Sequence, residues 1–581
     1  MIQKVGIPTI DLQVARIESV GKNNAPSEPV YRLPQYTLSC NKQEFVINRS
    51  YTVNIVKTRS GSLPMVVNVS CVGGIATLTS FSTEEDVTNI IVKPISSPGP
   101  CRLTFTCEEE VVGEFEMQEV LTVPAYTLSC EDRIFTQEEI YSISISRITA
   151  PIKRMQIDVE CIGGTVSLAS LVDEGGVLAF DNKKIDVTPN AETCTVVLKC
   201  TLDGQEYRVG QYMMNNVKSP YSVSTIRINQ NISDPNTMIT GDVNGDAIKA
   251  IRTNSHIYLG KYTGGGEMTI CQLSDVNSNY YHDGSNAMLT GEQGDVFMRL
   301  PRFYTLANEV ERDIWDISFA YGKKPSDAWH EWGGDDLIGV YKSGRIGYGI
   351  YSISNIIPAG FNYHEDAVNY AQNRGNGYNL VGFRHHNIMA FLFMAIYGTT
   401  DSQATCGSGI PGYRKLTGSN DTLGMTDTTS EDNGIKNVKF WGLENWWSDS
   451  NEFIYDMYVG NGVCLINDED HKNMGIPINA KSGYISKIRI TNNLEALPTV
   501  TKLATSTTMY CDYLTHIINS IGSAVCRSGA SCNANNGIFC LNMNISQLDN
   551  AEEKTSSRLC FRGTLIEQKN VEAFKAIPIT N

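Results

Sequence analysis

The chain contains an internal repeat with a period of 90 residues, and no other feature constrains its fold as much. The motif YTLSC occurs at Tyr36–Cys40 and again at Tyr126–Cys130. The motif Cys-(Val/Ile)-Gly-Gly also returns 90 residues later, at Cys71–Gly74 and Cys161–Gly164. Two more cysteines match at a separation of 93 residues, Cys101 with Cys194 and Cys107 with Cys200. The repeat indicates two copies of one folding unit, the second with a three-residue insertion upstream of these cysteines.

Each copy consists of short stretches in which apolar and polar residues alternate. Tyr51–Val56 reads YTVNIV and Tyr141–Ser146 reads YSISIS, the pattern of a strand with one buried face. Gly, Pro and Asn separate these stretches. Short alternating strands over about 90 residues are typical of an immunoglobulin-like β-sandwich. We therefore expect two all-β domains of this kind, at residues 35–124 and 125–217.

The two predicted sandwiches contain neither histidine nor tryptophan, so they lack the side chain that most often serves in acid–base chemistry. Their eight cysteines lie at matching positions and are expected in the two cores. Rigid spacer domains are the simplest interpretation, and a glycan-binding role for the sandwiches is the alternative.

The chain has 16 cysteines, a number that suits a secreted protein held together by disulfides. However, the first residues, MIQKVGIPTI, are not followed by the long apolar segment and cleavage site of an export signal. We therefore expect free, buried thiols rather than structural disulfides. None of the cysteines forms the paired C-x-x-C pattern of a structural zinc site.

Composition limits the partners of the chain. With 581 residues, it is long enough for three to five domains. It has 47 basic and 63 acidic residues, a net charge of −16, and this balance gives no basic surface for nucleic acid. The longest strongly apolar run, Ile388–Tyr397, has 10 residues, about half of a membrane span. It predicts a buried helix and no membrane insertion.

Residues 1–34 read as an extended arm, because prolines recur at Pro8, Pro26, Pro29 and Pro34 and no helical period is present. An arm of this kind cannot bury much of itself. We expect it to be ordered only against a partner, as the segment that docks the chain on a larger assembly.

A β-rich connector domain is expected at residues 218–345, where the composition changes. All eight histidines lie beyond residue 250. Residues 291–304 and 313–319 predict strands. Residues 242–246 read DVNGD, like the start of a calcium loop, but Ala247 and Thr253 stand where an EF-hand needs Gly and Glu. The segment therefore predicts a polar turn and no metal site.

The last predicted domain, residues 346–581, mixes helices and strands. Helices are expected at Glu365–Arg374, which Gly375 follows, and at Asn387–Tyr397, which Gly398 follows. A short strand is expected between them at Gly377–Phe383. Further strands are expected at residues 483–490, 536–543 and 557–563. This pattern predicts an α+β fold.

The aromatic run Phe440–Trp447 holds three of the six tryptophans and encloses a Glu-Asn pair. Large aromatic side chains form cores, and a carboxylate among them must be hydrogen-bonded. We expect the structural core of the last domain to include Trp441, Glu444, Asn445, Trp446 and Trp447.

Three stretches resemble segments of C-type-lectin-like domains, in the branch that formylglycine-generating enzymes share with the variable adhesins of diversity-generating retroelements. They are Tyr397–Gly409, Trp441–Glu452 and Ser528–Leu541 followed by Arg558–Leu559. The second matches the family's Gly-(Ile/Leu)-Glu-Asn…Trp-Gly-Asn segment, with Ser448 in place of a usual glycine. With residues 291–304, the combination is similar to fibre and tail-associated proteins of Bacteroidetes phages, the crAss-like group among them. The resemblance covers about residues 220–581 and implies a C-type-lectin-like domain.

No enzymatic activity and no cofactor are expected. A cysteine nucleophile needs a nearby base, and no histidine follows His516 among the cysteines near the end of the sequence. His385 and His386 are expected as capping and core groups rather than metal ligands. Glu444 and Asp449 could be the paired carboxylates of a glycosidase, but the resemblance makes Glu444 structural.

A hairpin near the C-terminus is the expected ligand-binding face. Its amides, hydroxyls and one aromatic ring suit polar ligands such as sugars, or a protein surface. In the retroelement adhesins the corresponding hairpin is the variable receptor-binding face. Solvated turn residues without a ligand remain the alternative. The candidate residues are Arg527, Ser528, Ser531, Asn533, Asn535, Asn536, Phe539, Asn542 and Asn544.

Together these features predict a fibre or adhesin subunit of a phage virion, on the head or the tail, that binds host cell-surface polysaccharide or protein. The arm would dock on capsid or tail proteins, and the subunit would assemble in the host cytoplasm as a homo-oligomer, with a trimer expected. The alternative is a purely structural decoration protein whose lectin-like domain contacts other virion proteins.

Overall fold

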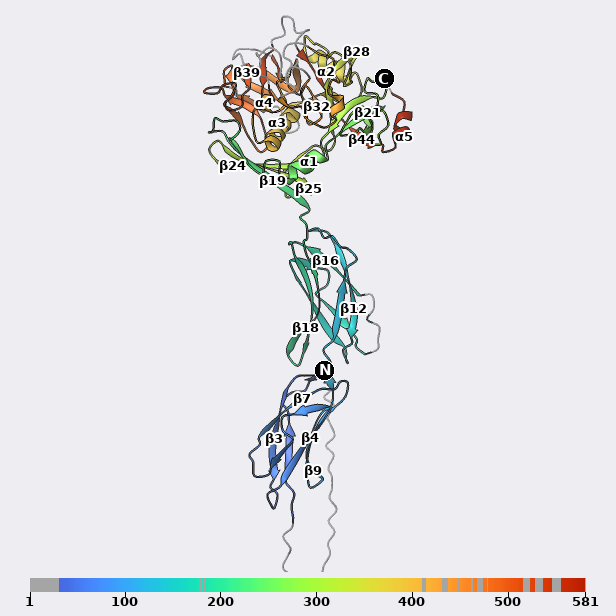
Figure 1. Cartoon of the computed structure of the whole chain (residues 1–581), viewed down its shortest axis with the longest axis vertical. Helices are drawn as coiled ribbons and strands as arrows, with labels where there is room; N and C mark the ends of the chain where they lie inside the picture. Colours follow the sequence, from blue (N-terminus) through green and yellow to red (C-terminus); the bar gives the residue numbers. More distant parts are fainter. Residues whose placement is uncertain are drawn as a thin grey trace, which may run out of the picture. The chain divides into compact units, whose positions relative to one another are not determined.

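The computed structural model describes residues 31–176, 180, 183–409, 414–430, 437–447, 450–460, 463–467, 474–477, 479–515, 523–527, 537–545 and 555–579. The chain forms two compact units, Met1–Ser219 and Pro220–Asn581 (Figure 1). Nearly all of the predicted docking arm lies outside the described residues, so the arm stays a prediction.

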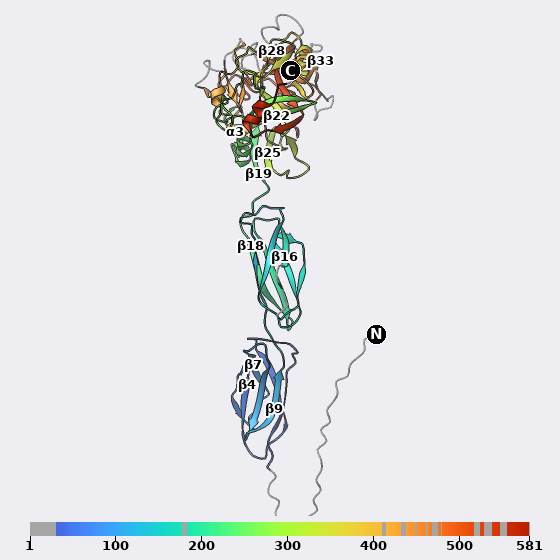
Figure 2. The same ribbon diagram turned by 90° about the vertical axis from the view of Figure 1, so that its right-hand side faces the viewer.

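The first unit contains two β-sandwiches, and each consists of two four-stranded antiparallel sheets (Figure 2). In the first sandwich one sheet has the order β1 (Gln35–Ser39), β3 (Tyr51–Arg59), β7 (Asn89–Pro94), β5 (Gly74–Ala76). The other has the order β6 (Ser80–Ser82), β4 (Val66–Val72), β8 (Cys101–Cys107), β9 (Glu110–Met117). This arrangement is immunoglobulin-like.

The second sandwich repeats the first, strand for strand. Its first sheet has the order β11 (Ala125–Ser129), β12 (Tyr141–Thr149), β16 (Lys183–Pro189), β14 (Gly164–Val166). Its second has the order β15 (Ser170–Asp173), β13 (Met155–Ile162), β17 (Cys194–Leu202), β18 (Gln205–Met214). The sequence repeat is therefore a repeat of the whole topology.

Alternating side chains build each sandwich core. Tyr51, Val53 and Ile55 of β3 are buried and their neighbours in the strand are exposed, and β12 has the same pattern. The hydroxyl of Tyr51 accepts a hydrogen bond from the Val46 amide at 2.6 Å, and that of Tyr141 accepts one from the Thr136 amide at 2.7 Å. The repeat thus preserves polar contacts as well as apolar packing.

The register of the strands refines the predicted insertion. Tyr51 pairs with Val92 and Tyr141 with Val187, so the two valines are 95 residues apart. The cysteines that open β8 and β17 are 93 residues apart. The second copy is therefore five residues longer before β16 and two residues shorter after it, which gives the net insertion of three that the cysteine spacing shows.

The second unit contains three larger sheets. The seven-stranded sheet has the order β30 (Tyr378–Leu380), β43 (Arg558–Arg562), β27 (Asp336–Lys342), β23 (Asp295–Arg299), β21 (His256–Gly264), β22 (Glu267–Gln272), β44 (Thr564–Glu567). The five-stranded sheet has the order β20 (Ile239–Gly241), β19 (Tyr221–Asn229), β25 (Ile314–Gly322), β24 (Phe303–Glu311), β26 (His330–Trp332).

The eight-stranded sheet has the order β35 (Met474–Pro477), β34 (Val463–Ile466), β33 (Asn451–Gly460), β40 (Ser523–Arg527), β41 (Leu541–Ile545), β39 (Tyr513–Thr515), β36 (Gly483–Tyr484), with β42 (Thr555–Ser556) paired to β33. The helices of this unit are α1 (Asp246–Thr253), α2 (His364–Gln372), α3 (Phe383–Tyr397), α4 (Ser402–Cys406) and α5 (Val571–Ala576).

The seven-stranded sheet corrects the predicted boundary between a connector at 218–345 and a lectin-like domain at 346–581. Its strands β21, β22, β23 and β27 come from the first of these segments, and β30, β43 and β44 come from the second. The end of the chain returns to pair with strands about 220 to 300 residues earlier. Local sequence patterns cannot reveal pairing between strands so far apart in the chain. The structure therefore has one compact unit where the sequence predicted two domains.

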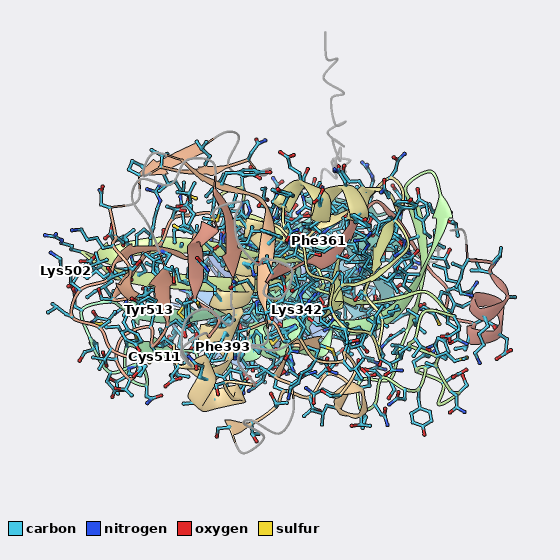
Figure 3. All side chains as sticks on the ribbon, turned by 90° about the horizontal axis from the view of Figure 1, so that it is seen from above. Lys342, Phe361, Phe393, Lys502, Cys511 and Tyr513 are labelled. Carbon is cyan, nitrogen blue, oxygen red and sulfur yellow. The ribbon has the colours of Figure 1, made fainter. Side chains whose placement is uncertain are left out.

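Helix α3 lies in the core of the second unit, as its apolar sequence indicates. Phe393 of α3 packs against the rings of Phe440 and Trp447, with centroids 5.5 and 6.0 Å away. Seen from above, Phe393 lies within the body of the unit while the exposed Lys502 lies at its margin (Figure 3). Gly398 ends α3 with a φ of 66°, a left-handed conformation that favours glycine.

The C-terminal helix α5 is attached through one buried lysine. The Nζ atom of Lys261 donates to the carbonyl oxygens of Phe574, Lys575 and Ile577, at 3.0, 3.0 and 2.7 Å. These carbonyls lie at the end of α5, where the last helical turn leaves acceptors without partners. In the part of the chain that the structure describes, no helix is long and apolar enough to cross a membrane.

Candidate functional site

A cleft of about 820 Å³ lies in the second unit, where β30 forms one edge of the seven-stranded sheet. Four segments surround it: the loop between α2 and β30, the start of α3, the β33–β34 hairpin, and β43. The lining residues are Gln372, Gly375, Asn376, Gly377, Tyr378, Asn379, Leu380, Gly382, His385, Tyr455, Asp456, Asn467, Cys560 and Arg562.

The loop between α2 and β30 can form because two glycines adopt left-handed conformations. Gly375 has a φ of 129° and Gly377 a φ of 94°. At Gly377 a Cβ atom would also lie 2.6 Å from the carbonyl oxygen of Arg562. The sharp turn lets β30 pair with β43, with Asn379 opposite Cys560. This pairing places the polar residues of the loop beside β43.

A carboxylate from a distant strand caps the N-terminus of α3. The Oδ1 atom of Asp456 in β33 accepts a hydrogen bond from the Phe383 amide at 2.7 Å. Gly382 permits this approach, because a Cβ atom there would lie 2.5 Å from the Asp456 Oδ2 atom. A carboxylate at a helix N-terminus satisfies a free amide and interacts well with the helix dipole. Asp456 therefore has a structural role in the floor of the cleft.

His385 links the cleft to a half-buried ion pair. Its Nδ1 atom accepts from the Gly382 amide at 3.3 Å, so its Nε2 atom carries the proton and donates to Asp336, 3.3 Å away. The other oxygen of Asp336 lies 3.0 Å from Arg562 Nε. Burial would raise the pKa of Asp336, but the hydrogen bond from His385 and the positive charges nearby lower it to about 2.

Cys560 lies beside His385 but is not activated. Its Sγ atom is 3.9 Å from the same Nε2 atom that donates to Asp336, so this nitrogen has no lone pair to remove the thiol proton. Burial, with a smaller contribution from Asp336, raises the pKa of Cys560 to about 12. A nucleophilic cysteine needs a lowered pKa and an available base. Cysteine, histidine and aspartate are close here without forming that arrangement.

The rim of the cleft is formed by polar, uncharged side chains. Gln372, Asn376 and Asn467 are exposed, and Asn379 and Tyr455 are half-buried. Amide side chains both donate and accept hydrogen bonds, and a tyrosine adds an apolar ring face with a polar tip. The charged groups of the floor are held in ion pairs or helix caps. The cleft is therefore suited to a polar ligand rich in hydroxyl or amide groups.

The predicted binding hairpin is only partly described. Ser528, Ser531, Asn533, Asn535 and Asn536 lie outside the described residues. Arg527 lies in β40 and Asn544 in β41, and these strands pair antiparallel.

Two of the predicted ligand-binding residues are corrected by the structure. Phe539 is fully buried, with its ring 4.9 Å from that of Tyr510, and Asn542 is only 6% exposed. We expected alternation to display one face of the hairpin. However, β41 lies inside the eight-stranded sheet, and consecutive residues Leu541, Asn542 and Met543 are all buried. Because both side chains are buried, neither can be part of a ligand-binding surface.

The five residues expected in the structural core are all buried. The carboxylate of Glu444 accepts hydrogen bonds from the amides of Gly418 and Asn420, at 2.9 and 3.1 Å, and so ties a loop to the tryptophan run. The indole nitrogens of Trp441 and Trp447 donate to Ser255 and Gly407. Burial raises the pKa of Glu444 to about 7, and the neighbouring Asp421 carboxylate adds to this effect.

The start of α3 also differs from the prediction. We expected a helix from Asn387, with His385 and His386 before it, but α3 begins at Phe383 and both histidines are buried within it. His385 accepts from the Gly382 amide locally, but the carboxylate that caps the helix, Asp456, lies 73 positions away in the sequence. Among the described residues no group of three or more His, Cys, Asp or Glu side chains is placed to hold a metal ion.

Sequence reasoning did not identify the cleft. The one local signal was the sequence GNGYN at residues 375–379, a turn rich in Gly and Asn between a helix and a strand. The residues that complete the cleft, Tyr455, Asp456 and Cys560, come from segments far along the chain.

Comparison with known proteins finds only weak similarities. No protein-family model and no curated protein matches the sequence. Among solved structures, the D0–D1 domain of intimin is 10% identical with a TM-score of 0.13, over 31% of this chain and 97% of that one. The Escherichia coli adhesin FdeC is 11% identical with a TM-score of 0.17, over 52% of this chain and 90% of that one.

A C-terminal intimin fragment in complex with the intimin-binding domain of its translocated receptor is 13% identical with a TM-score of 0.22, over 33% of this chain and 68% of that one. Similarities this low carry no argument about function. The immunoglobulin-like character of the sandwiches rests on their own strand order.

Proposed function

We propose that this chain is an adhesin subunit that binds a cell-surface glycan through the cleft of its second unit. The observation that carries the proposal is the rim of uncharged amide and tyrosine side chains above a floor whose charges are already paired. Sugars present many hydroxyl groups, and side-chain amides can meet these as donors and as acceptors. The chemistry of Cys560 and His385 supports binding rather than catalysis.

The assembly around this site is part of the same proposal. The subunit belongs to a phage virion fibre, on the head or the tail, and forms inside the host cell as a homotrimer. Residues 1–34 dock it on capsid or tail proteins, and the two sandwiches act as spacers. The region around α2, α3 and the eight-stranded sheet has a C-type-lectin-like fold. The sequence resemblance and the buried Trp441–Trp447 run support this part of the proposal.

The test measures binding of the full chain to capsular polysaccharides and intact cells of candidate Bacteroidetes hosts. We expect saturable, strain-dependent binding. Replacing the exposed rim residues Gln372 and Asn467 by alanine should weaken it about tenfold or more, because each loses hydrogen bonds worth about 1 kcal/mol. Asn286→Ala is the matched control, since this exposed amide does not line the cleft.

A second set of variants tests the hairpin. Asn533, Asn535 and Asn536 are replaced by alanine together, and Phe539 is left intact because it belongs to the core. Loss of binding in this variant alone, with the rim variants unaffected, would move the site from the cleft to the hairpin. Full-strength binding by both sets would contradict a glycan site at either place.

A structural decoration protein is the second candidate, and one surface feature favours it. The hairpin of β28 (Gly344–Ile346) and β29 (Gly349–Tyr351) exposes Ile346 by 51% and Tyr348 by 81%. Exposed apolar side chains of this size are common in protein–protein contacts. If no strain binds the chain, while Tyr348→Ser abolishes its incorporation into particles, decoration is the better description.

A further inference from the structure

Each sandwich of the first unit contains a pair of thiols in van der Waals contact. The Sγ atoms of Cys71 and Cys101 are 3.6 Å apart, and those of Cys161 and Cys194 are 3.5 Å apart. The cysteines that the structure describes carry free thiols. The same contact thus occurs at the same place in both copies of the repeat, although the copies differ by insertions between the paired residues.

Both pairs bridge two neighbouring strands. Cys71 lies in β4 opposite Leu103, two residues after Cys101 in β8, and Cys161 lies in β13 opposite Val196, two residues after Cys194 in β17. The thiols are therefore diagonal neighbours on the inner face of one sheet. Diagonal residues on adjacent strands are close enough for their side chains to meet.

A glycine of the facing sheet keeps space for each pair. A Cβ atom at Gly74 would lie 2.5 Å from the Cys101 sulfur and 3.0 Å from the Cys71 sulfur. At Gly164 the corresponding distances, to Cys194 and Cys161, are 2.7 and 3.2 Å. Any larger residue would push between or against the sulfurs. The Cys-(Val/Ile)-Gly-Gly motif therefore contains both a thiol and the residue that makes room for its partner.

We propose that the pairs Cys71–Cys101 and Cys161–Cys194 are modification sites that close to intramolecular disulfides when the protein meets a small-molecule disulfide. The thiolate of one cysteine attacks a sulfur of the small molecule, forms a mixed disulfide and releases one thiol. The second cysteine then attacks the protein sulfur of the mixed disulfide, so the protein S–S bond forms and the second small thiol leaves. Two protons and two electrons pass from each pair to the small disulfide.

The two members of each pair have different roles in this exchange. Cys71 and Cys161 are half-buried, whereas Cys101 and Cys194 are fully buried. Burial raises the pKa of both buried thiols to about 12. Burial also raises the pKa of Cys71 and Cys161, but a hydrogen bond from the neighbouring thiol opposes this rise. The half-buried cysteine is thus the one that a small molecule reaches first, and the buried one resolves the mixed disulfide. A disulfide bond of about 2.05 Å needs the two sulfurs of each pair to approach by about 1.5 Å.

The test treats the folded, reduced full chain with oxidised glutathione and maps its disulfides by mass spectrometry. We expect the peptides containing Cys71 and Cys101, and those containing Cys161 and Cys194, to become cross-linked within one chain. The melting temperature of the first unit should rise by roughly 5 °C or more and return after reduction, since each bond closes a long loop.

Variants separate this proposal from general thiol oxidation. Cys71→Ser and Cys161→Ser, at half-buried positions, should each remove one cross-link and leave the other. Cys40→Ser and Cys130→Ser are matched controls, because these cysteines are also half-buried, and they should leave both cross-links intact. Stable glutathione adducts without cross-links, cross-links between chains, or bonds that form only in denaturant would each overturn the proposal. It does not depend on the proposed function.

Discussion

At the scale of single residues, Arg558 holds together segments of the second unit that are far apart in the sequence, and no local sequence pattern predicts these contacts. Its guanidinium is fully buried, pairs with Glu452 at 3.1 Å and lies over the Trp446 ring. It also donates to the carbonyl oxygens of Gly339, Val340, Glu444 and Asn445, at 2.7 to 3.0 Å. The planar fork of arginine can satisfy all these acceptors at once, and a lysine ammonium cannot.

We therefore predict that Arg558→Lys lowers the free energy of unfolding of the second unit by about 3 kcal/mol or more, because carbonyls and a carboxylate lose their donors in the core. Urea unfolding followed by tryptophan fluorescence measures this unit alone, since all six tryptophans lie beyond residue 220. The control is Arg227→Lys, which affects an exposed pair with Asp316 and should cost less than about 1 kcal/mol. Equal losses in the two variants would contradict the role of Arg558.

At the scale of elements, the parts that could be predicted from sequence are those whose signals are local. The strand pairs that include Tyr51 and Tyr141 follow from alternation and from the repeat, and the end of α3 follows from Gly398. The beginning of α3 could not be predicted, because its cap is Asp456 on β33. The burial of Phe539 could not be predicted either, because it depends on packing against Tyr510 and on the hydrogen bond to Asp512.

Asp512 also links segments that are far apart in the sequence, and it predicts how the stability of the second unit depends on pH. Asp512 accepts hydrogen bonds from the amides of Gly537 and Phe539, at 2.7 and 2.8 Å, and from Gln403 of α4, at 3.1 Å. Burial nonetheless raises the pKa of Asp512 to about 7, above the value of an unfolded chain. The folded state therefore binds the proton more tightly, and stability is lost as pH rises through about 7.

The expected result is that the free energy of unfolding of the second unit falls between about pH 4 and pH 7 and levels off at higher pH. The two pKa values limit the contribution of Asp512 to about 4 kcal/mol, and Glu444, with its pKa also near 7, contributes in the same direction. Urea unfolding at several pH values measures the slope. Asp512→Asn should make the slope shallower. A stability that does not fall over this range would show that these two carboxyl groups remain ionised in the folded state.

At the scale of the whole molecule, the seven-stranded sheet decides how the chain can be divided. Among the described strands, β44 pairs with β22 alone, and β43 lies between β27 and β30. Strands from residues 256–342 thus provide most of the partners for the end of the chain. Composition changes near residue 218 do mark a real boundary, since the chain divides there into two compact units. The predicted boundary at 345 has no counterpart, because pairing between distant strands leaves no trace in local composition.

This arrangement predicts different behaviour for three fragments. Residues 1–219 and residues 220–581 should each be soluble and unfold cooperatively, because each contains complete sheets and its own core. Residues 346–581 should aggregate or remain unfolded, because β43 and β44 lose their partners and expose Leu559 and Phe561 along an unpaired strand edge. Sedimentation, circular dichroism and tryptophan fluorescence of the purified fragments distinguish these states. If residues 346–581 are soluble and unfold with the same tryptophan signal as residues 220–581, the strands before residue 345 are dispensable. In that case residues 346–581 would be a domain of their own, and the cleft beside β43 would form without the long-range pairing that places it here.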